Sequence, residues 1–536
     1  MATVRKCFNV SADCKPELHY MVNIEGKLKE IRRMVDRGDY FTINRARQYG
    51  KTTVLKALGR YLQQDYVVLS LDFQKLSQQD FESEASFVEA LAREIRKKEA
   101  FLNSASAQIT EQMSALTQGM GVRLSVLFDC LSRWCGECSQ SDRGPVVLLI
   151  DEVDSAADHV VFLDFLSQLR GYYIDRDETS TFYSVILAGV YDIRQLRRKV
   201  RPQEEHTYNS PWNIAADFLV DMSFSEKGIA GMLQEYEQDF QTGMNITNTA
   251  KFIYDYTSGY PYLVSRICKI TDERIAGSSR WPDRQSAWTK EGLQAAVRVL
   301  LGEKNTLFES LVNKLADFQE VRAMIYGLLF EGKELPFHSL NHTLQTAVMF
   351  GFIKESNGNA VVSNRIFETI LYNLFLSEEA LCSSMYQAAS LHRSQFVTDG
   401  RLDMELVLQK FAEHFIEIYG GQGETFLEDV GRRYFLLYLK PIINGTGNYY
   451  IEAQTRNLQR TDVIVDFHGE QFIIELKIWR GSAYHEKGEE QLGCYLDSYG
   501  LKKGYLLTFC FQKKKQKKTE IRKRNIGDKT LIEVLV

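Results

Sequence analysis

The sequence predicts an α/β protein of several domains, and three observations lead to this fold class. The chain has 536 residues, which is too long for one hydrophobic core and corresponds to roughly three or four domains. Runs of β-branched and apolar residues alternate with amphipathic helical segments, which is typical of a parallel sheet covered on both faces. The composition, with 44% hydrophobic and 25% charged residues and only 8 prolines, is ordinary for a folded protein.

Charge and cysteine content narrow the class further. The formal charge of -5, from 65 basic and 70 acidic residues, excludes a uniformly basic nucleic-acid coat but leaves room for a local basic patch. The 9 cysteines are too sparse and irregular for a disulfide framework. Met1–Pro16 has no signal-peptide pattern, and no apolar stretch of about 18 residues occurs. We therefore expect a cytoplasmic protein with no membrane partner.

The first third of the chain is predicted to form the parallel sheet. Four short apolar runs read as buried strands, and the segment Phe81–Lys98 between the second and third reads as a helix. The predicted strands are Tyr40–Asn44, Tyr66–Phe73, Pro145–Ile150 and Tyr183–Val190. This pattern predicts an α/β core domain.

The remainder is predicted to be helical and then α/β again. Residues 225–301 have a helical pattern that 258–261 interrupt, and residues 305–376 are predicted to be helices with a small β-hairpin turning at 356–358. Helices followed by such a hairpin suggest a winged-helix module. The predicted domains are 1–222 (α/β core), 223–302 (helical lid), 303–377 (winged-helix-like), 378–423 (helical connector) and 424–536 (second α/β domain).

A phosphate-binding motif follows the first predicted strand. The letters RARQYGKT at 45–52 match the P-loop pattern G-x-x-x-x-G-K-[ST] at Gly50, Lys51 and Thr52, whereas Arg45 replaces the first glycine. Backbone N–H groups at a helix N-terminus bind phosphate oxygens. We expect Lys51 to reach the β- and γ-phosphates and Thr52 to bind Mg²⁺. An ordinary helix start is the alternative.

The second half of the nucleotide site is predicted about 100 residues later, on successive strands of the sheet. The run VVLLIDE at 146–152 would deliver Asp151 to the Mg²⁺ shell and Glu152 to the attacking water. The predicted ATP-binding residues are Arg47, Gln48, Gly50, Lys51, Thr52, Thr53 and Asp151, with Thr52 and Asp151 also holding the metal.

Weaker candidates follow the fourth strand. Asp192 and Arg194 are placed where a residue could sense the γ-phosphate, although a solvated loop is at least as good an interpretation. The basic residues Arg194, Arg197, Arg198, Lys199 and Arg201 either include an arginine finger or form a solvated helix face, which we favour.

Residues 17–376 resemble the AAA-like ATPase domains of bacterial proteins related to the STAND and archaeal-type ATPases. The similar stretches are HYMV (19–22), RARQYGKTT (45–53), LLIDEVD (148–154), AGVYDIRQLR (188–197), SPWNI (210–214) and TSGYPYLV (257–264). The resemblance implies an ATP- and Mg²⁺-binding switch with a helical lid and a winged helix, and a homo-oligomer in some members. The family similarly tolerates a residue other than glycine at the first P-loop position.

A second chemical constellation lies in RTDVIVDFHGEQFIIELKIWR at 460–480. Two strands around a turn on Gly469 and Glu470 would place Asp462 opposite Lys477, with Glu475 two residues away on the same face. Two carboxylates bind Mg²⁺, which lowers the pKa of a bound water, while a lysine positions the nucleophile. A plain ion pair between Lys477 and Asp462 is the alternative.

Residues 424–536 resemble the PD-(D/E)XK nuclease superfamily, without the proline before the first acid. Asp462 matches the first acid, and Glu475 and Lys477 match its E-x-K. Glu428 matches its additional helix acid, and Gln491 with Tyr495 its Gln-x-x-x-Tyr element. The resemblance implies catalysis by Asp462, Glu475, Lys477 and Gln491, and Mg²⁺ or Mn²⁺ at Glu428, Asp462 and Glu475. It implies DNA as substrate, and the fusion implies ATP-gated cleavage and a role in bacterial defence.

Three further signals carry less weight. WCGEC at 134–138 mimics a redox motif, but it lacks the strand that should precede it. Residues 502–524 hold ten Lys and Arg, where DNA contact is slightly favoured over a solvated turn. The winged-helix-like segment is not notably basic, so we favour packing over DNA binding there.

Three functions therefore stay open. The first is an ATP-gated, Mg²⁺-dependent DNA nuclease. The second is a nucleotide-dependent signalling or assembly switch whose C-terminal domain binds nucleic acid or protein without cleaving. The third is a motor on DNA. No motif identifies the trigger or an activating protein partner.

Overall fold

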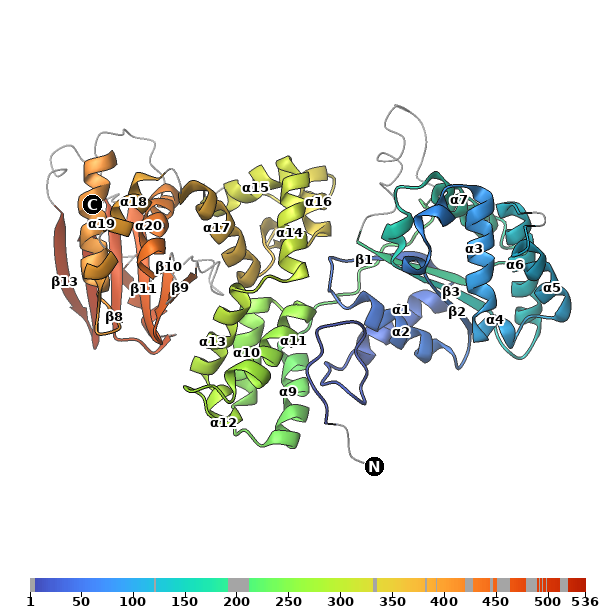
Figure 1. Ribbon diagram of the computed structural model, residues 1–536, viewed down its shortest axis with the longest axis horizontal. Coiled ribbons are helices and arrows are strands. Elements are labelled where there is room, and N and C mark those ends of the chain that lie inside the picture. The colour runs from blue at the N-terminus through green and yellow to red at the C-terminus, as the bar shows by residue number, and fades with distance from the viewer. Residues whose placement is uncertain are drawn as a thin grey trace. The chain divides into compact units, whose positions relative to one another are not determined.

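The computed structural model (Figure 1) describes most of the chain. The described residues are 5–119, 122–190, 212–330, 335–380, 383–391, 393–419, 428–443, 447–450, 463–478, 489–490, 492–493, 495–497, 499–510 and 519–536. They divide into two compact units. Unit 1 comprises Met1–Ala250, Gly259–Lys269 and Met349–Gly351, and unit 2 comprises Lys251–Ser258, Ile270–Val348 and Phe352–Val536. The domain limits expected from the sequence remain predictions.

Unit 1 is built on a parallel sheet. Its strands are β1 (Tyr40–Asn44), β2 (Val67–Asp72), β3 (Val146–Asp151) and β4 (Ser184–Gly189), in the order β1-β4-β3-β2. The four predicted strands are confirmed within one residue at each end. The prediction that the two nucleotide motifs follow successive strands is wrong, because the crossover after β3 inserts β4 between β1 and β3.

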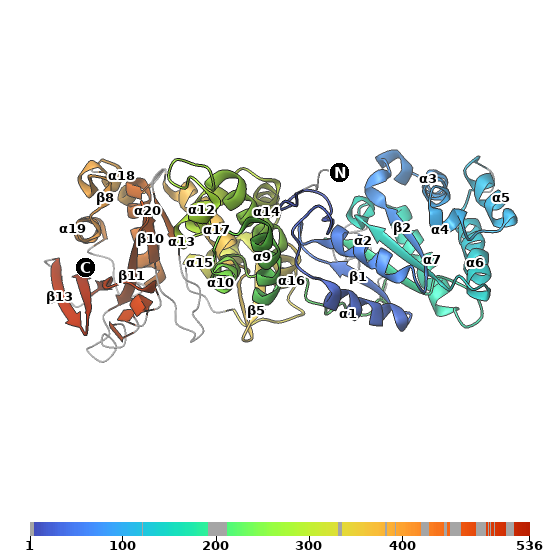
Figure 2. The same cartoon turned by 90° about the horizontal axis from the view of Figure 1, so that it is seen from below.

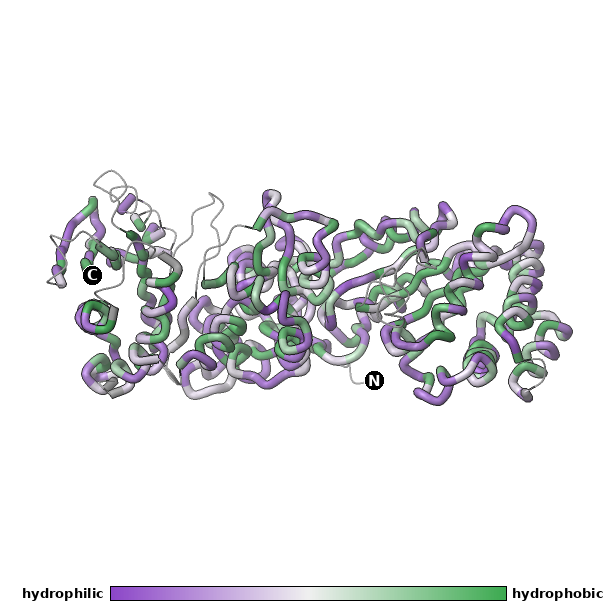
Figure 3. Tube along the Cα trace, turned by 90° about the horizontal axis from the view of Figure 1, so that it is seen from above, coloured by the Kyte–Doolittle hydropathy of each residue, from purple (hydrophilic) through white to green (hydrophobic). Residues whose placement is uncertain are grey.

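Helices cover both faces of this sheet (Figures 1 and 2). They are α1 (Glu25–Asp36) and α2 (Lys51–Leu62) on one face, and α3 (Glu84–Arg96), α4 (Glu99–Leu102), α5 (Ala107–Leu116), α6 (Leu124–Gln140) and α7 (Val160–Ile174) on the other. Alternate strand residues serve the two cores: Phe41 packs toward α1 and α2, and Tyr40 toward the opposite helices. Figure 3 marks these strands as mostly hydrophobic, as burial on both faces requires.

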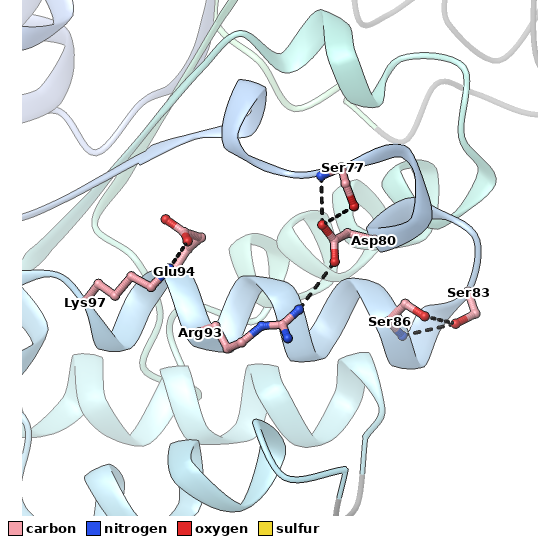
Figure 4. A network of polar contacts seen from close by, with 7 residues as sticks. All are labelled: Ser77, Asp80, Ser83, Ser86, Arg93, Glu94 and Lys97. Atoms are coloured by element: carbon pink, nitrogen blue, oxygen red, sulfur yellow. Dashed lines mark hydrogen bonds and ion pairs between the residues drawn. The ribbon is translucent and has the colours of Figure 1, made fainter.

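Helix α3 begins three residues later than predicted, and Figure 4 shows why. The carboxylate of Asp80 accepts a hydrogen bond from the backbone N–H of Ser77 at 2.7 Å, which closes a separate short turn. The hydroxyl of Ser83 then accepts from the backbone N–H of Ser86 at 3.1 Å and caps the helix. An ion pair from Arg93 to Asp80 at 3.4 Å joins the two elements.

A helical region follows, with one small hairpin. Its elements are α9 (Glu226–Phe240), α10 (Ile246–Thr257), α11 (Pro261–Ile270), α12 (Arg284–Ala287), α13 (Lys290–Leu301), α14 (Thr306–Asp317), α15 (Gln319–Phe330), α16 (His342–Met349), β5 (Ile353–Ser356), β6 (Asn359–Val362) and α17 (Arg365–Ala380). The assignment of α14–α17 to a winged helix remains a prediction. Within the described part of the chain, no helix has the length and apolar character that crossing a bilayer requires.

Unit 2 also holds a six-stranded mixed sheet. Its strands are β9 (Gly447–Tyr450), β10 (Val463–Phe467), β11 (Glu470–Ile478), β12 (Lys503–Phe509), β13 (Glu520–Ile526) and β14 (Lys529–Leu535), in the order β13-β14-β12-β11-β10-β9. Strands β9, β10 and β11 form an antiparallel meander, after which β12 runs parallel to β11.

The segment predicted as a helical connector packs against this sheet. It forms α18 (Ser384–Leu391), the short strands β7 (Val397–Thr398) and β8 (Arg401–Leu402), and α19 (Met404–Tyr419), which precede α20 (Glu428–Ile443). Phe411 and Phe415 of α19 lie against Phe509 of β12, with ring centroids 6.3 and 5.3 Å apart. Because these rings are buried against β12, the segment is part of the hydrophobic core of the C-terminal sheet.

The predicted register of the β10–β11 hairpin is wrong. The turn consists of His468 and Gly469, with φ values of 49° and 89°, and Phe467 pairs with Glu470. A two-residue turn of this kind needs positive φ at both positions, which glycine accepts readily at the second. The predicted turn would have required positive φ at Glu470.

Candidate functional site

The predicted P-loop connects β1 to α2 and ends in a left-handed glycine. Gly50, with φ of 81°, is the last residue before α2, whose first residue is Lys51. Lys51 is only 7% exposed, and its ammonium donates to the carbonyl oxygens of Arg45 at 2.9 Å and Ala46 at 3.0 Å. The lysine charge thus lies inside the loop, where backbone N–H groups of α2 also point.

Carboxylates from the end of β3 face this lysine. Burial raises the pKa of Asp151, which a hydrogen bond from the Thr52 hydroxyl opposes. Burial also raises the pKa of Glu152, and the neighbouring Asp151 charge adds to the shift. Burial lowers the pKa of Lys51, and the carboxylates of Asp154, Glu152 and Asp151 oppose that shift. The loop therefore holds one buried cation among three acids.

Asp154 is a candidate functional residue that sequence reasoning missed. Its carboxylate accepts a hydrogen bond from the backbone N–H of Val190 at 2.7 Å, which ties the end of β3 to the end of β4. A Cβ on Gly189 would meet the same carboxylate at 2.8 Å, so this approach requires glycine. The third acid of the DEVD sequence at 151–154 was the available signal, but its partner, the backbone N–H of Val190, follows another strand.

The remaining predicted P-loop residues have different surroundings. The hydroxyl of Thr53 accepts from the backbone N–H of Cys14 at 3.2 Å, so it is engaged by the N-terminal segment. Arg47 is exposed, and Gln48 has a positive φ of 57°. Arg47 is therefore free to meet a ligand from solvent, whereas the clearest role of Gln48 is to shape the loop.

Tyr260 is a second contact that the sequence did not reveal. Its buried hydroxyl donates to the carbonyl oxygen of Arg47, and its ring lies edge-on to that of Tyr49 with centroids 4.6 Å apart. A Cβ on Gly351, with φ of 78°, would approach the Cβ of Ala46 to 2.9 Å. Two segments distant in sequence therefore support the P-loop within unit 1.

Gly259→Ala is expected to destabilise unit 1 by about 3 kcal/mol or more, because it adds steric overlap to left-handed strain. Its φ is 73°, and a Cβ there would lie 1.9 Å from the carbonyl oxygen of Phe224. Gly119→Ala is the matched control, since φ is 79° there but the nearest atom, a carboxylate oxygen of Glu89, is 3.6 Å away. The control should cost about 1 kcal/mol. Equal losses in thermal unfolding midpoint would contradict the overlap.

The weaker candidates after β4 cannot be placed in this geometry. Asp192, Arg194, Arg197, Arg198, Lys199 and Arg201 lie outside the described residues.

The residues at this sheet edge fit a nucleoside triphosphate with Mg²⁺. The buried carboxylate of Asp151 and the adjacent Thr52 hydroxyl are hard oxygen donors of the kind Mg²⁺ takes, and a divalent cation would offset the burial that raises the pKa of Asp151. Lys51 would hold phosphate oxygens, and Glu152 is placed to orient a water.

The C-terminal candidates centre on β11. Glu475 is fully buried, and its carboxylate lies 3.0 Å from the ammonium of Lys477, two residues further along the same face. The neighbouring strands add a second buried pair, in which the hydroxyl of Thr508 donates to Glu533 at 3.1 Å. Buried charges need partners, and this face of the sheet supplies several.

The other predicted residues of this site are only partly described. Asp462 and Gln491 lie outside the described residues, and Glu428 is the first residue of α20 with its side chain outside them. Tyr495 is buried. Among the described residues no cluster of three or more His, Cys, Asp or Glu could hold a metal. The predicted metal set therefore remains a prediction.

The signals given less weight have ordinary surroundings where they are described. Cys135 and Cys138 are buried in α6, and burial raises the pKa of Cys135 well above its usual range. In the basic segment, 511–518 lies outside the described residues. Lys523 pairs with Glu405 at 2.8 Å and Arg524 with Glu489 at 3.0 Å, which partly neutralises β13.

Comparison with known proteins agrees with the nucleotide-site geometry. Residues 17–276 match the model of the AAA-like domain family, so this part of the chain is similar to the AAA-like domains of P-loop ATPases. Such a domain implies ATP, usually with Mg²⁺. No curated protein matches the chain.

Two solved structures show distant similarity. The Walker-type ATPase PABY2304 of Pyrococcus abyssi is 12% identical with a TM-score of 0.45, covering 68% of this chain and 99% of that chain. The ORC2 protein of Aeropyrum pernix, in ADPNP–ADP complexes, is 12% identical with a TM-score of 0.34, covering 69% of this chain and 97% of that chain.

Proposed function

We propose that this protein is an ATP-driven switch that gates Mg²⁺-dependent cleavage of DNA phosphodiester bonds by its C-terminal domain. The AAA-like domain supports the first half of the proposal. The observation that carries the second half is the buried pair of Glu475 and Lys477 on a central strand of a mixed sheet. A role in bacterial defence follows from the resemblance of the whole architecture alone.

In the nucleotide half, each proposed role follows from position. Lys51 neutralises the β- and γ-phosphates, and Thr52 with Asp151 holds Mg²⁺. Glu152 orients the attacking water, and Asp154 links the site to the backbone N–H of Val190. ATP binding or hydrolysis thereby changes the contacts at the end of β4.

In the nuclease half, the chain order supports the proposal. Helix α20 precedes the meander β9–β10–β11, helical residues at 489–490, 492–493 and 495–497 follow, and β12 then returns parallel to β11. The resemblance to PD-(D/E)XK nucleases likewise implies a helix ahead of the strands, with Glu428, and a helix behind them, with Tyr495.

The proposal requires the two acids to face each other across the β10–β11 hairpin. Val463, which follows Asp462 in the sequence, pairs with Ile474, which precedes Glu475, so the proposal requires this register to continue by one residue. Directly opposite residues have Cβ atoms about 4.5–5.5 Å apart, which lets two carboxylates share one cation.

The proposed chemistry divides between the cation and Lys477. Mg²⁺, or Mn²⁺ in its place, lowers the pKa of a bound water and stabilises charge on the phosphorus. Lys477 positions the nucleophile or neutralises the phosphate, and Gln491 would assist from the following helix.

A second candidate is a nucleotide-dependent signalling or assembly switch whose C-terminal domain binds nucleic acid or protein without cutting. The 3.0 Å contact between Lys477 and Glu475 favours it, because a buried ion pair can serve packing alone. In this second candidate function, Asp462, Glu475 and Lys477 have no catalytic role.

Plasmid nicking separates the two candidates. Supercoiled DNA is incubated with Mg²⁺ or Mn²⁺, with and without ATP, and open-circular product is measured for the wild type and for Asp462→Ala. The proposal expects metal-dependent nicking that ATP changes and that Asp462→Ala reduces by at least about 100-fold. Absence of cleavage in every nucleotide state, with the wild type equal to Asp462→Ala, leaves the binding switch.

A further inference from the structure

Arg45 occupies the P-loop position where the motif has glycine, and its side chain has specific partners. The guanidinium donates to the carbonyl oxygen of Asn44 at 2.8 Å and to that of Val220 at 2.9 Å. It lies over the ring of Phe218, 5.3 Å from the ring centroid. The backbone N–H of Arg45 donates to Gly189 at 3.2 Å. The side chain is thus directed away from the phosphate side and toward residues 218–220.

The segment that Arg45 contacts runs along the sheet and then enters a helix. Ala216 makes a parallel bridge to Phe41 of β1, and the rings of Phe218 and Phe41 stack at 5.9 Å with an interplanar angle of 5°. Lys27 of α1 donates to the carbonyl oxygen of Asp221 at 2.7 Å. This segment ends at Met222, and helix α9 begins four residues later at Glu226.

The burial of this guanidinium indicates a specific role. Burial is the main cause that lowers the pKa of Arg45, so the environment opposes the charge. The two carbonyl oxygens and the aromatic face compensate, because the planar guanidinium can donate in two directions while it stacks on a ring. A lysine or a glycine offers no such combination.

We propose that Arg45 is a positioning residue that locks the P-loop to residues 212–222 and couples nucleotide binding to helix α9. The inference rests on the proposed nucleotide function of the same loop. Arg45→Gly restores the glycine of the standard P-loop motif, and yet we expect this variant to bind ATP more weakly. Arg45 has this effect through its contacts with residues 218–220 and not through contact with the phosphates.

Two measurements on the full chain test this inference. ATP affinity is measured by calorimetric titration with Mg²⁺, and amide hydrogen exchange of residues 212–240 is compared with and without ATP. We expect Arg45→Gly to weaken ATP binding by about 10- to 100-fold, the effect of losing one charged hydrogen bond, and to remove the ATP-dependent exchange response of α9. Arg45→Lys, which has one donor nitrogen and no planar group to stack, should recover only part of the ATP affinity and of the α9 exchange response.

Variants of the partner segment provide the controls. Phe218→Leu removes the stacked ring without touching the P-loop and should reduce the α9 response in the same direction. The adjacent residue Leu219 is 88% exposed, so Leu219→Ser should leave both readouts at the wild-type level. Non-additive effects in the Arg45→Gly/Phe218→Leu double variant would locate the coupling in this contact.

The outcomes are distinguishable from failure of the proposed function. A wild type that binds no ATP overturns the nucleotide function and this inference together. A wild type that binds ATP, with Arg45→Gly equal to it in affinity and in α9 exchange, overturns this inference alone. If Arg45→Gly does not fold, Phe218→Leu decides, and an unchanged α9 response in that variant overturns the coupling.

Discussion

Lys51→Ala should abolish ATP turnover and weaken ATP binding by about 10- to 100-fold, because a hydrogen bond to a charged group contributes about 1.5–3 kcal/mol. The ammonium is buried within the P-loop, donates to two of its carbonyl oxygens and faces the acids at the end of β3. Its removal leaves the phosphates without their nearest cation while the acids stay in place. Phosphate release and calorimetric titration with ATP measure the two effects.

A second lysine of the same helix is the matched control. Lys56 pairs with Asp13 at 2.8 Å, and its side chain is 54% exposed. Lys56→Ala should therefore bind and hydrolyse ATP at the wild-type level, because an exposed ion pair contributes little. ATP turnover that survives Lys51→Ala would show that the loop between β1 and α2 is not the nucleotide site.

The second large effect concerns Glu475 and Lys477. Glu475→Gln should reduce Mg²⁺-dependent nicking by at least about 1,000-fold, because a neutral amide neither holds the cation nor balances Lys477. Lys477→Met should lower stability by about 3–5 kcal/mol, the usual result of leaving one charge of a buried pair. Nicking assays and thermal unfolding in the presence of EDTA measure the two quantities separately.

The double variant separates chemistry from packing. Glu475→Gln/Lys477→Met removes both charges of the 3.0 Å pair and should regain most of the stability lost in Lys477→Met. Nicking should stay absent. A double variant that regains stability and also cleaves DNA would remove these residues from the proposed chemistry.

Local sequence signals predicted the elements of the fold well. The four strands of unit 1 are short runs of apolar residues bounded by polar ones, and burial on both faces makes that signal continuous. The hairpin register was missed because it depends on one residue: His468 adopts a positive φ, which is uncommon for residues other than glycine even though histidine, like asparagine and aspartate, adopts it more often than most.

Contacts between distant segments could not be predicted in the same way. The motif itself indicated Lys51, Thr52 and Asp151 because each stands at the end of a strand or the start of a helix. Arg45 looked like a defect in the motif, since its partner Val220 is 175 residues away. Tyr260 is 213 residues from the carbonyl oxygen that it meets. No local periodicity encodes such pairs.

The nucleotide unit is assembled from three separate stretches of chain, and this affects how the gene can be divided. Gly259–Lys269 supplies Tyr260, and Met349–Gly351 supplies the close approach to Ala46. A fragment that ends where the family match ends, at residue 276, keeps the first stretch and loses the second. A functional ATPase fragment should therefore extend past residue 351. For the same reason, exchanging the N-terminal halves of related proteins should succeed only when residues 349–351 come from the same protein as the P-loop.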